Sequence, residues 1–341
     1  MMPAIETTPR RQAPQPMDIP TLRDQRTAVA APITVDELVV NWHVTEACNY
    51  RCGYCYAAWQ REDGRRDVVR DEQATRELVS ALWAGFHPGN TANALSRTLR
   101  WSHVRLSIAG GEPMLYPQQV LDIARQAREL GMRVSLITNG SRLPEGEALE
   151  ALARQLDVLG LSLDSFSTAH NLRIGRADSR DRTLSLADMA TRLRRARAAN
   201  PRLQVKINTV VSAVNAGEDL VRALDLLRPD RWKVLRMLPV VNSNLAVDDE
   251  AFASFVARHA GRVAGMSVED NTDMLGSYVM VDPQGRFFQN GTGTQGSYFY
   301  SQPITRDTVH RAFASVPFLA ERFAARYRPM ATAHGNVAGT A

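Results

Sequence analysis

Three cysteines within eight residues constrain this chain more than any other feature. They are the only cysteines among its 341 residues, and they stand in CNYRCGYC as Cys48, Cys52 and Cys55, a C-x3-C-x2-C spacing. An odd and tightly clustered set does not resemble a disulfide framework. Because thiolates are soft ligands that suit zinc, copper or iron–sulfur clusters, the spacing indicates a metal site.

The chain supplies no fourth cysteine for this site. A [4Fe–4S] cluster normally takes four cysteine ligands, so three would leave one iron open to bind a small molecule. A structural zinc ion would instead need a fourth side chain, for which His43 and His103 are the candidates. The spacing by itself leaves both interpretations open.

The surrounding sequence predicts an α/β fold. Six apolar runs alternate with helix-like segments, which is typical of a parallel sheet flanked by helices. The cysteines follow the first run directly, at the carboxyl end of a strand, where barrels keep their chemistry. We predict a partial (βα)6 TIM-like barrel. Its strands are expected at 38–44, 104–110, 133–139, 157–164, 203–211 and 231–238, and its helices at 70–86, 117–130, 145–155, 183–199 and 215–227.

The pattern changes after the sixth predicted strand. The stretch SYVMVDPQGRFF predicts a hairpin that turns at Pro283 to Gly285, and the Gly- and Thr-rich loop after it is a candidate lid. Helices are expected on both sides of these segments. The predicted parts are a disordered leader at 1–36, the barrel core at 37–240, a C-terminal extension closing the barrel at 241–328 and a flexible tail at 329–341. Within the extension, helices are expected at 248–260 and 305–327 and the loop at 290–303.

Composition narrows the classes of partner. The chain is 44% hydrophobic and 23% charged, which is normal for a globular protein. No run is long enough to cross a membrane and the start has no apolar signal segment, so we expect a cytoplasmic protein without a membrane partner. A formal charge of +5 suits an anionic ligand but does not indicate a nucleic acid.

The only two lysines occupy unusual places. Lys206 in VKINTV and Lys233 in RWKVLR both fall in strand-like runs. Residues two apart share a face of a strand, so Lys206 lies beside Asn208 and Lys233 beside Arg231, opposite their apolar neighbours. We expect all four to project into the barrel. Three such cations need a multiply anionic ligand, such as a polyphosphate, unless they pair with internal carboxylates or extend to the mouth of the barrel.

Further segments resemble the radical S-adenosylmethionine (SAM) superfamily. AGGEP, TNGS and SLDS end the second, third and fourth predicted strands, and KIN, RWKV and SYVMVDPQGRF narrow the resemblance to viperins, above all prokaryotic ones. The resemblance covers about residues 40–290 and implies a [4Fe–4S] cluster on the three cysteines, whose open iron chelates SAM. It implies SAM contacts from Gly110, Gly111, Glu112, Thr138, Asn139, Ser141, Ser162 and Arg176, with Asp164 as a further candidate.

The viperin resemblance also implies a reaction. In that family reductive cleavage of SAM gives a 5′-deoxyadenosyl radical, which removes the 4′ hydrogen of a ribonucleoside triphosphate. The 3′ hydroxyl then leaves as water, and the 3′-deoxy-3′,4′-didehydro product terminates RNA chains in antiviral and antiphage defence. CTP, UTP or GTP is the implied substrate, and a flavodoxin- or ferredoxin-type protein is the implied reductant.

Several interior residues gain roles from the same resemblance. Tyr278 is expected near the substrate sugar, as the donor of the electron and proton that quench the product radical. The remaining implied nucleotide contacts are Lys206, Asn208, Arg231 and Lys233 at the triphosphate and Asn41 and His43 at the base or sugar.

The chain departs from the viperin pattern after the RF segment. NGTGTQGSYFYSQ stands where viperins carry basic residues, and Arg306 or Arg311 are the candidates to replace them. Two alternatives to the nucleotide reaction remain. One is a radical SAM enzyme that modifies a peptide, although many of those carry extra C-terminal cysteines. The other is a non-enzymatic nucleotide or metal sensor.

Overall fold

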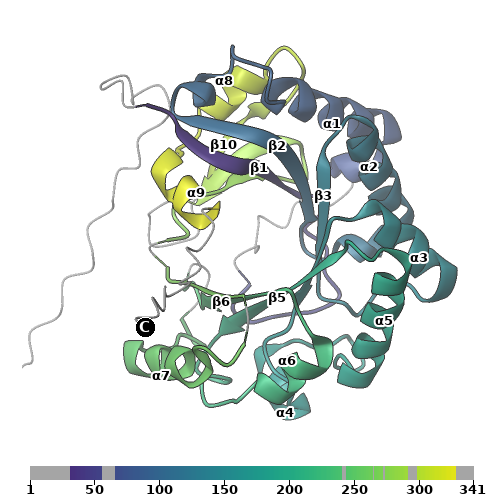
Figure 1. Cartoon of the computed structure of the whole chain (residues 1–341), viewed down its shortest axis with the longest axis vertical. Coiled ribbons are helices and arrows are strands. Elements are labelled where there is room, and N and C mark those ends of the chain that lie inside the picture. Colours follow the sequence, from purple (N-terminus) through teal and green to yellow (C-terminus); the bar gives the residue numbers. More distant parts are fainter. Residues whose placement is uncertain are drawn as a thin grey trace, which may run out of the picture.

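A single curved sheet organises the protein, seen here in a computed structural model that describes residues 31–55, 66–239, 243–263, 265–271, 273–290 and 298–327. Its strands run in the order β10-β9-β8-β1-β2-β3-β4-β5-β6-β7. The sheet curves like the wall of a partial barrel, with helices along its outer side (Figure 1). The first six strands are β1 (Ile33–His43), β2 (Leu99–Ala109), β3 (Arg133–Thr138), β4 (Val158–Ser162), β5 (Gln204–Val211) and β6 (Arg231–Arg236).

The six predicted strands are confirmed, and the predicted α/β barrel of the radical SAM type is an open sheet. Two short strands extend the parallel part: β7 (Met266–Glu269) pairs with β6, and β8 (Val279–Val281) pairs with β1. The predicted hairpin is present, since β8 and β9 (Arg286–Asn290) are antiparallel. β10 (Tyr298–Pro303) then pairs antiparallel with β9.

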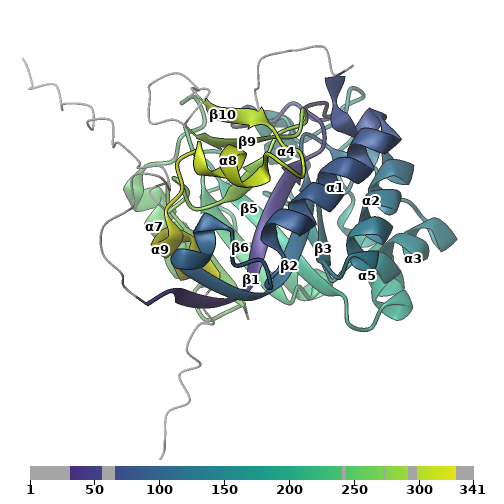
Figure 2. The same cartoon turned by 90° about the horizontal axis from the view of Figure 1, so that it is seen from above.

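Helices between successive strands cover the outer face of the sheet (Figure 2). The helix predicted at 305–327 is in fact two, separated by residues 315–319, which include Pro317, a residue that cannot donate a helical hydrogen bond. Among the described residues no helix is both long and apolar enough to cross a membrane. The helices are α1 (Glu72–Phe86), α2 (Pro117–Glu129), α3 (Gly146–Gln155), α4 (Thr168–Ile174), α5 (Leu186–Ala199), α6 (Val221–Leu227), α7 (Asp249–His259), α8 (Val309–Ala314) and α9 (Ala320–Tyr327).

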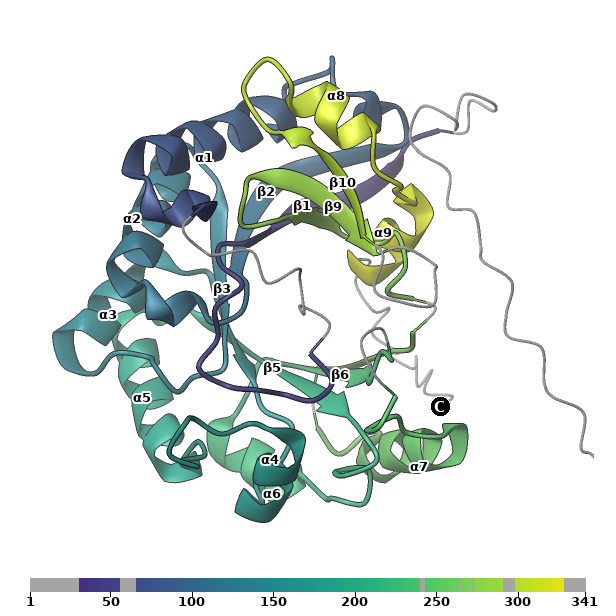
Figure 3. The same cartoon turned by 180° about the vertical axis from the view of Figure 1, so that it is seen from behind.

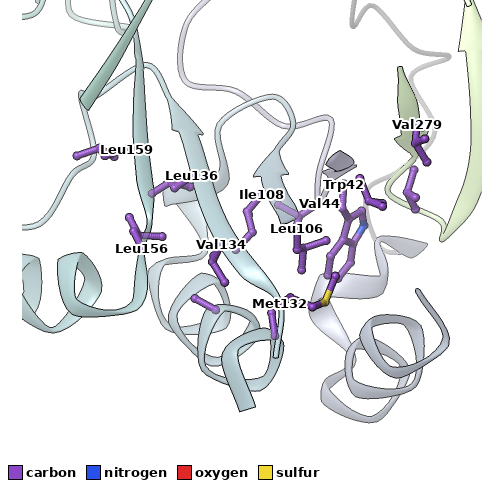
Figure 4. Packing of buried hydrophobic residues seen from close by; sticks show 14 of the residues in the cluster. Trp42, Val44, Leu106, Ile108, Met132, Val134, Leu136, Leu156, Leu159 and Val279 are labelled. Carbon is purple, nitrogen blue, oxygen red and sulfur yellow. The ribbon is translucent and has the colours of Figure 1, made fainter. Parts of the chain in front are cut away.

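Alternation along the strands separates a core face from an interior face. Trp42, Ile108 and Leu136 lie in the main hydrophobic core (Figure 4), and full burial of such side chains contributes about 1.5–3 kcal/mol each. Their neighbours in sequence point the other way. The inward residues of the strands are polar or small for the most part, namely Asn41, His43, Ser107, Ser135, Gly160, Lys206, Asn208 and Lys233.

The predicted boundaries need adjustment. β1 begins at Ile33, so residues 33–36, predicted as the end of the leader, belong to the sheet. Residues 298–303 of the predicted loop form β10, and 291–297 and the predicted tail lie outside the described residues. β7 and β10 end the sheet at its two edges, and α9 lies beside the opening (Figure 3).

Candidate active site

The three cysteines lie on a loop, residues 45–55, that follows β1 at the carboxyl end of the parallel strands. None of the three forms a disulfide within the described part of the chain, and Cys48 and Cys55 are exposed while Cys52 is less so. Burial raises the pKa of the Cys52 thiol to about 11. A cluster must therefore displace these protons when it binds, as thiolate-coordinating metals do.

The segment after β2 holds the first half of the cysteine loop. The Gly111 amide donates to the Thr45 carbonyl at 2.7 Å, and the Glu112 amide to the Ala47 carbonyl at 2.8 Å. A Cβ at Gly111 would stand 2.2 Å from the Ala47 oxygen, and Gly110 has a φ of +146°. The absence of a side chain at these two glycines therefore lets the cysteine loop approach closely.

Glu112 joins the ends of two strands. Its buried carboxylate accepts hydrogen bonds from the Thr138 hydroxyl at 2.6 Å, the Asn139 amide at 2.7 Å and the Met114 amide at 2.9 Å. Desolvation raises the pKa of Glu112 although these donors oppose it. The carboxylate therefore fixes the TNGS segment in place.

The TNGS segment in turn contacts the loop. The side-chain nitrogen of Asn139, Nδ2, lies 3.0 Å from Asn49 Oδ1 and 3.8 Å from Cys48 Sγ. The Ser141 hydroxyl donates to Asn139 Oδ1 at 2.6 Å and accepts from Asn49 Nδ2 at 2.9 Å. These side chains orient the loop around its first cysteine.

A buried ion pair holds the second half of the loop. Arg176 donates to Asp164 at 3.3 Å and to the Tyr54 hydroxyl at 2.9 Å, and it also donates to the Ser162 carbonyl. Tyr54 donates to the same Asp164 carboxylate, whose other oxygen accepts from the Val210 amide at 2.9 Å. Because Arg176 and Asp164 are both buried, removing either side chain would leave the other as a buried charge without its ion-pair partner.

The end of α4 packs directly on the loop. The Arg51 amide donates to the Gly175 carbonyl at 3.0 Å, and the Gly53 amide to the Ile174 carbonyl at 2.9 Å. Gly175 has a φ of +87°, and a Cβ there would stand 2.2 Å from the Arg51 oxygen. A glycine is therefore required at this contact.

The predicted SAM residues gather beside this loop. A small pocket there is lined by Asn139, Ser162 and Arg176 together with Tyr50 from the loop. Within the described ranges, no three His, Cys, Asp or Glu side chains converge as they would around one metal ion. Three cysteine thiols on one loop beside a polar pocket fit a cluster that spreads its ligands over separate irons and leaves one iron for SAM.

The two histidines considered for zinc are engaged elsewhere. His103 is exposed and forms an ion pair with Asp36 at 3.4 Å, towards the amino end of β2. His43 is buried and packs edge-on against Phe288 at 5.3 Å between ring centroids. Burial lowers the pKa of His43 to about 4, so its ring is neutral. Asn41, on the same face of β1, donates to the Val279 carbonyl at 3.3 Å.

The two lysines lie on adjacent strands and differ in their partners. In the β5–β6 register Lys206 faces Arg231 and Asn208 faces Lys233. Lys233 forms an ion pair with Glu269 of β7, whereas Lys206 has no hydrogen-bond or ion-pair partner in the part of the chain that the structure describes. Arg231 shares their face but is exposed at the start of β6.

Electrostatics reflects this crowding of cations. Burial, followed by repulsion from Lys233 and Arg105, lowers the pKa of Lys206 well below its ordinary value. Burial and the nearby Arg326 lower the pKa of Lys233 to about 8. An anion placed between the lysines would favour their protonated forms and so oppose both shifts.

Tyr278 lies beside Lys233, in a group that the sequence did not predict. Its hydroxyl donates to Glu269 at 3.0 Å and lies 3.4 Å from Lys233 Nζ. The Arg326 guanidinium of α9 stacks 3.7 Å from the centre of the tyrosine ring and pairs with Glu269 at 2.7 Å. Glu269 lies in a strand of only four residues and Arg326 is one of many arginines, so no sequence pattern predicts that either belongs to the site.

Fold and site together define a radical SAM protein: residues 42–227 match the model of the radical SAM superfamily. Solved structures with the same fold include native anSMEcpe with bound AdoMet, with a TM-score of 0.58 at 14% identity over 86% of this chain and 84% of that one. Proteins of this superfamily use a [4Fe–4S] cluster and SAM.

Similarity to named relatives is closer. The S-adenosylmethionine-dependent nucleotide dehydratase of Psychrobacter lutiphocae is 38% identical over 86% of this chain and 95% of that protein. The protein of the same name from Pseudoalteromonas ulvae is 39% identical over 86% of this chain and 94% of its own length. The chain therefore belongs to the viperin-like family of SAM-dependent nucleotide dehydratases.

Proposed function

We propose that this enzyme converts a ribonucleoside triphosphate, with CTP, UTP and GTP as candidates, to its 3′-deoxy-3′,4′-didehydro form. The product would act as an RNA chain terminator in antiviral or antiphage defence. A flavodoxin- or ferredoxin-type protein would supply electrons. The names of the relatives support the dehydratase reaction on a nucleotide, and the interior charges support a triphosphate.

The observation that carries this proposal is the unpaired Lys206. Interior cations normally have a partner, because an isolated buried charge is costly. Lys233, Arg105 and Arg326 have theirs in Glu269 and Glu37, but Lys206 has none among the described residues. A polyphosphate bridging Lys206 and Lys233, with Asn208 as an additional donor, would complete the charge balance.

The cofactor end is proposed to work by positioning. When bound, the cluster and SAM supply the radical that abstracts hydrogen. Asn139, Ser141, Ser162 and Arg176 would surround SAM, while Glu112 and Thr138 would hold that segment in place through the hydrogen bond between them. Gly110 and Gly111 would let the cysteine loop approach closely.

The substrate end is proposed to orient the sugar. Asn41 and the neutral His43 lie on the inward face of β1 and would contact the base or ribose. Tyr278 would lie near the sugar and return an electron to the product radical. Arg231, exposed at the strand start, would contact the outermost phosphate.

The experiment is an anaerobic incubation of reconstituted protein with SAM, a reductant and each of the four ribonucleoside triphosphates in turn. One or more should stimulate 5′-deoxyadenosine release and yield a nucleotide lighter by one water. The matching nucleoside monophosphate is the control, since it lacks the charge that Lys206 requires. If 5′-deoxyadenosine release were equal with every compound, or absent with all of them, a nucleoside triphosphate would not be the substrate.

A further inference from the structure

Glu269 is the carboxylate at the centre of the Tyr278 group, which consists of Tyr278, Lys233, Glu269 and Arg326. One of its oxygens accepts from Tyr278 at 3.0 Å, and the other receives both Lys233 and Arg326. Only 12% of its side chain is exposed. The group is assembled from β6, β7, α9 and the residue before β8, so four separate parts of the chain converge on one phenol.

Charge around Tyr278 makes the removal of an electron difficult. Arg326 covers the ring at 3.7 Å and the Lys233 ammonium lies 5.6 Å from its centre. Two cations against a π-face stabilise its electrons, and a tyrosine that loses an electron becomes a strong acid. Such a ring gives up an electron readily only if its proton leaves at the same time to a base in contact.

Glu269 is the base in contact. The phenol already donates to its carboxylate at ordinary hydrogen-bond length. The other charged neighbours, Lys233 and Arg326, are donors and cannot accept a proton from a phenol. Burial and the neighbouring carboxylate raise the pKa of Tyr278, so the resting group is a neutral phenol beside an ionised carboxylate.

We propose that Glu269 is the positioning residue and proton acceptor through which Tyr278 delivers its electron to the nucleotide, an inference that rests on the proposed function. After hydrogen abstraction at C4′, the C3′–O bond breaks and the departing hydroxide is released as water by combining with one proton that the buffer supplies. The nucleotide radical cation then gains one electron from Tyr278, whose O–H bond breaks as its proton passes to Glu269. This leaves a neutral tyrosyl radical, a Glu269 carboxylic acid and the dehydrated product.

The resting state is restored by a second electron. It comes from the external one-electron donor that also reduces the cluster, and the proton on Glu269 returns to the phenoxyl oxygen. Each turnover therefore consumes one electron for SAM cleavage and one for Tyr278. Glu269 begins and ends as a carboxylate paired with Lys233 and Arg326.

A purely structural role makes a different prediction. If Glu269 only neutralises Lys233 and Arg326, its loss should weaken nucleotide binding or stability and lower 5′-deoxyadenosine and product together. If it accepts the proton of Tyr278, 5′-deoxyadenosine should still form while the product fails to follow. The ratio of dehydrated nucleotide to 5′-deoxyadenosine separates the two roles.

The test compares Glu269→Gln with Glu37→Gln at saturating triphosphate. Glu37 is a matched control, because its side chain is also 12% exposed and paired, to Arg105 at 2.9 Å, without touching Tyr278. Glu269→Gln should lower the product ratio at least about tenfold, in the range that loss of one proton-transfer group costs. Tyr278→Phe should lower it equally, and Glu37→Gln should leave it unchanged.

A second measurement covers the case in which Glu269→Gln does not fold. In wild-type protein, D2O should lower the product ratio, since the phenol proton moves with the electron, and in Tyr278→Phe it should have no such effect. An unchanged ratio in Glu269→Gln, or no solvent effect in the wild type, would overturn the role of Glu269. Absence of any dehydrated nucleotide from the wild type would instead overturn the proposed function.

Discussion

The cysteine end and the lysine interior of this enzyme are built on opposite principles. Around the loop, internal partners engage the Glu112 carboxylate and both charges of the Asp164–Arg176 pair, so the frame is complete before any cofactor arrives. In the interior, Lys206 has no partner among the described residues, while Lys233 is paired with Glu269. The cysteine end is therefore prearranged to hold a cofactor rigidly, whereas the lysine interior carries positive charge that would attract an anionic ligand.

The largest effect that separates these regions should come from the cysteines. Cys52→Ala removes one of the three proposed cluster ligands and should abolish cluster binding and 5′-deoxyadenosine release altogether. Lys206→Met should keep normal iron content, because it belongs to the other region. Iron analysis and the visible spectrum after anaerobic reconstitution check both variants. Iron loss in Lys206→Met would mean that the two regions are not independent.

The next effect concerns the frame of the loop. Gly111→Ala places a methyl 2.2 Å from a backbone oxygen, and such overpacking should cost about 1–3 kcal/mol of unfolding free energy and weaken retention of iron. Gly217→Ala is the control, since a Cβ there meets nothing within 4 Å. Urea unfolding measures both. Equal stability of the two variants would show that the loop is not fixed by this contact.

A smaller effect distinguishes the two lysines. In protein without nucleotide, Lys206→Met should raise the free energy of unfolding by about 1 kcal/mol, because it removes a cation without a partner. Lys233→Met should raise it less, because that variant also loses the charged hydrogen bond to Glu269. Both should need more triphosphate for the same rate. Equal stability gains in the two variants would contradict the difference described here.

The smallest effect is a pH dependence of stability. Lys233 has a pKa of about 8 in the folded protein against an ordinary 10.5. Between these two pKa values Lys233 is more often protonated in the unfolded chain than in the folded protein. Its contribution therefore makes the free energy of unfolding rise with pH. Unfolding between about pH 8 and 10 should show this rise, and Lys233→Met should show less of it. An identical slope in both proteins would place Lys233 in contact with water.

Sequence reasoning found the features that lie close together in the chain. The cysteine spacing, the strand-end glycines and the inward facing of Lys206 and Lys233 all depend on local periodicity or motif. It placed Arg231 on the correct face but not at the exposed strand start, because alternation gives direction and not depth. It treated Glu112 as a cofactor ligand without showing that its carboxylate ties two strand ends.

Sequence reasoning missed what only the folded chain assembles. Glu269 lies on a strand of four residues, too short for a periodic signal, and Arg326 is one arginine among many in a final helix. Their pairing depends on the sheet bringing β7 towards α9 at its open side. The partners of Tyr278 could therefore not be read from motifs.

The most direct test of the central claim, that a radical formed at the cysteine end acts on a triphosphate held by the lysines, uses substrate labelled at one position. A ribonucleoside triphosphate carrying deuterium at C4′ is incubated anaerobically with SAM, reductant and the reconstituted enzyme. We expect deuterium in the released 5′-deoxyadenosine and no deuterium in the dehydrated nucleotide. Unlabelled 5′-deoxyadenosine, with deuterium retained in the nucleotide, would contradict it.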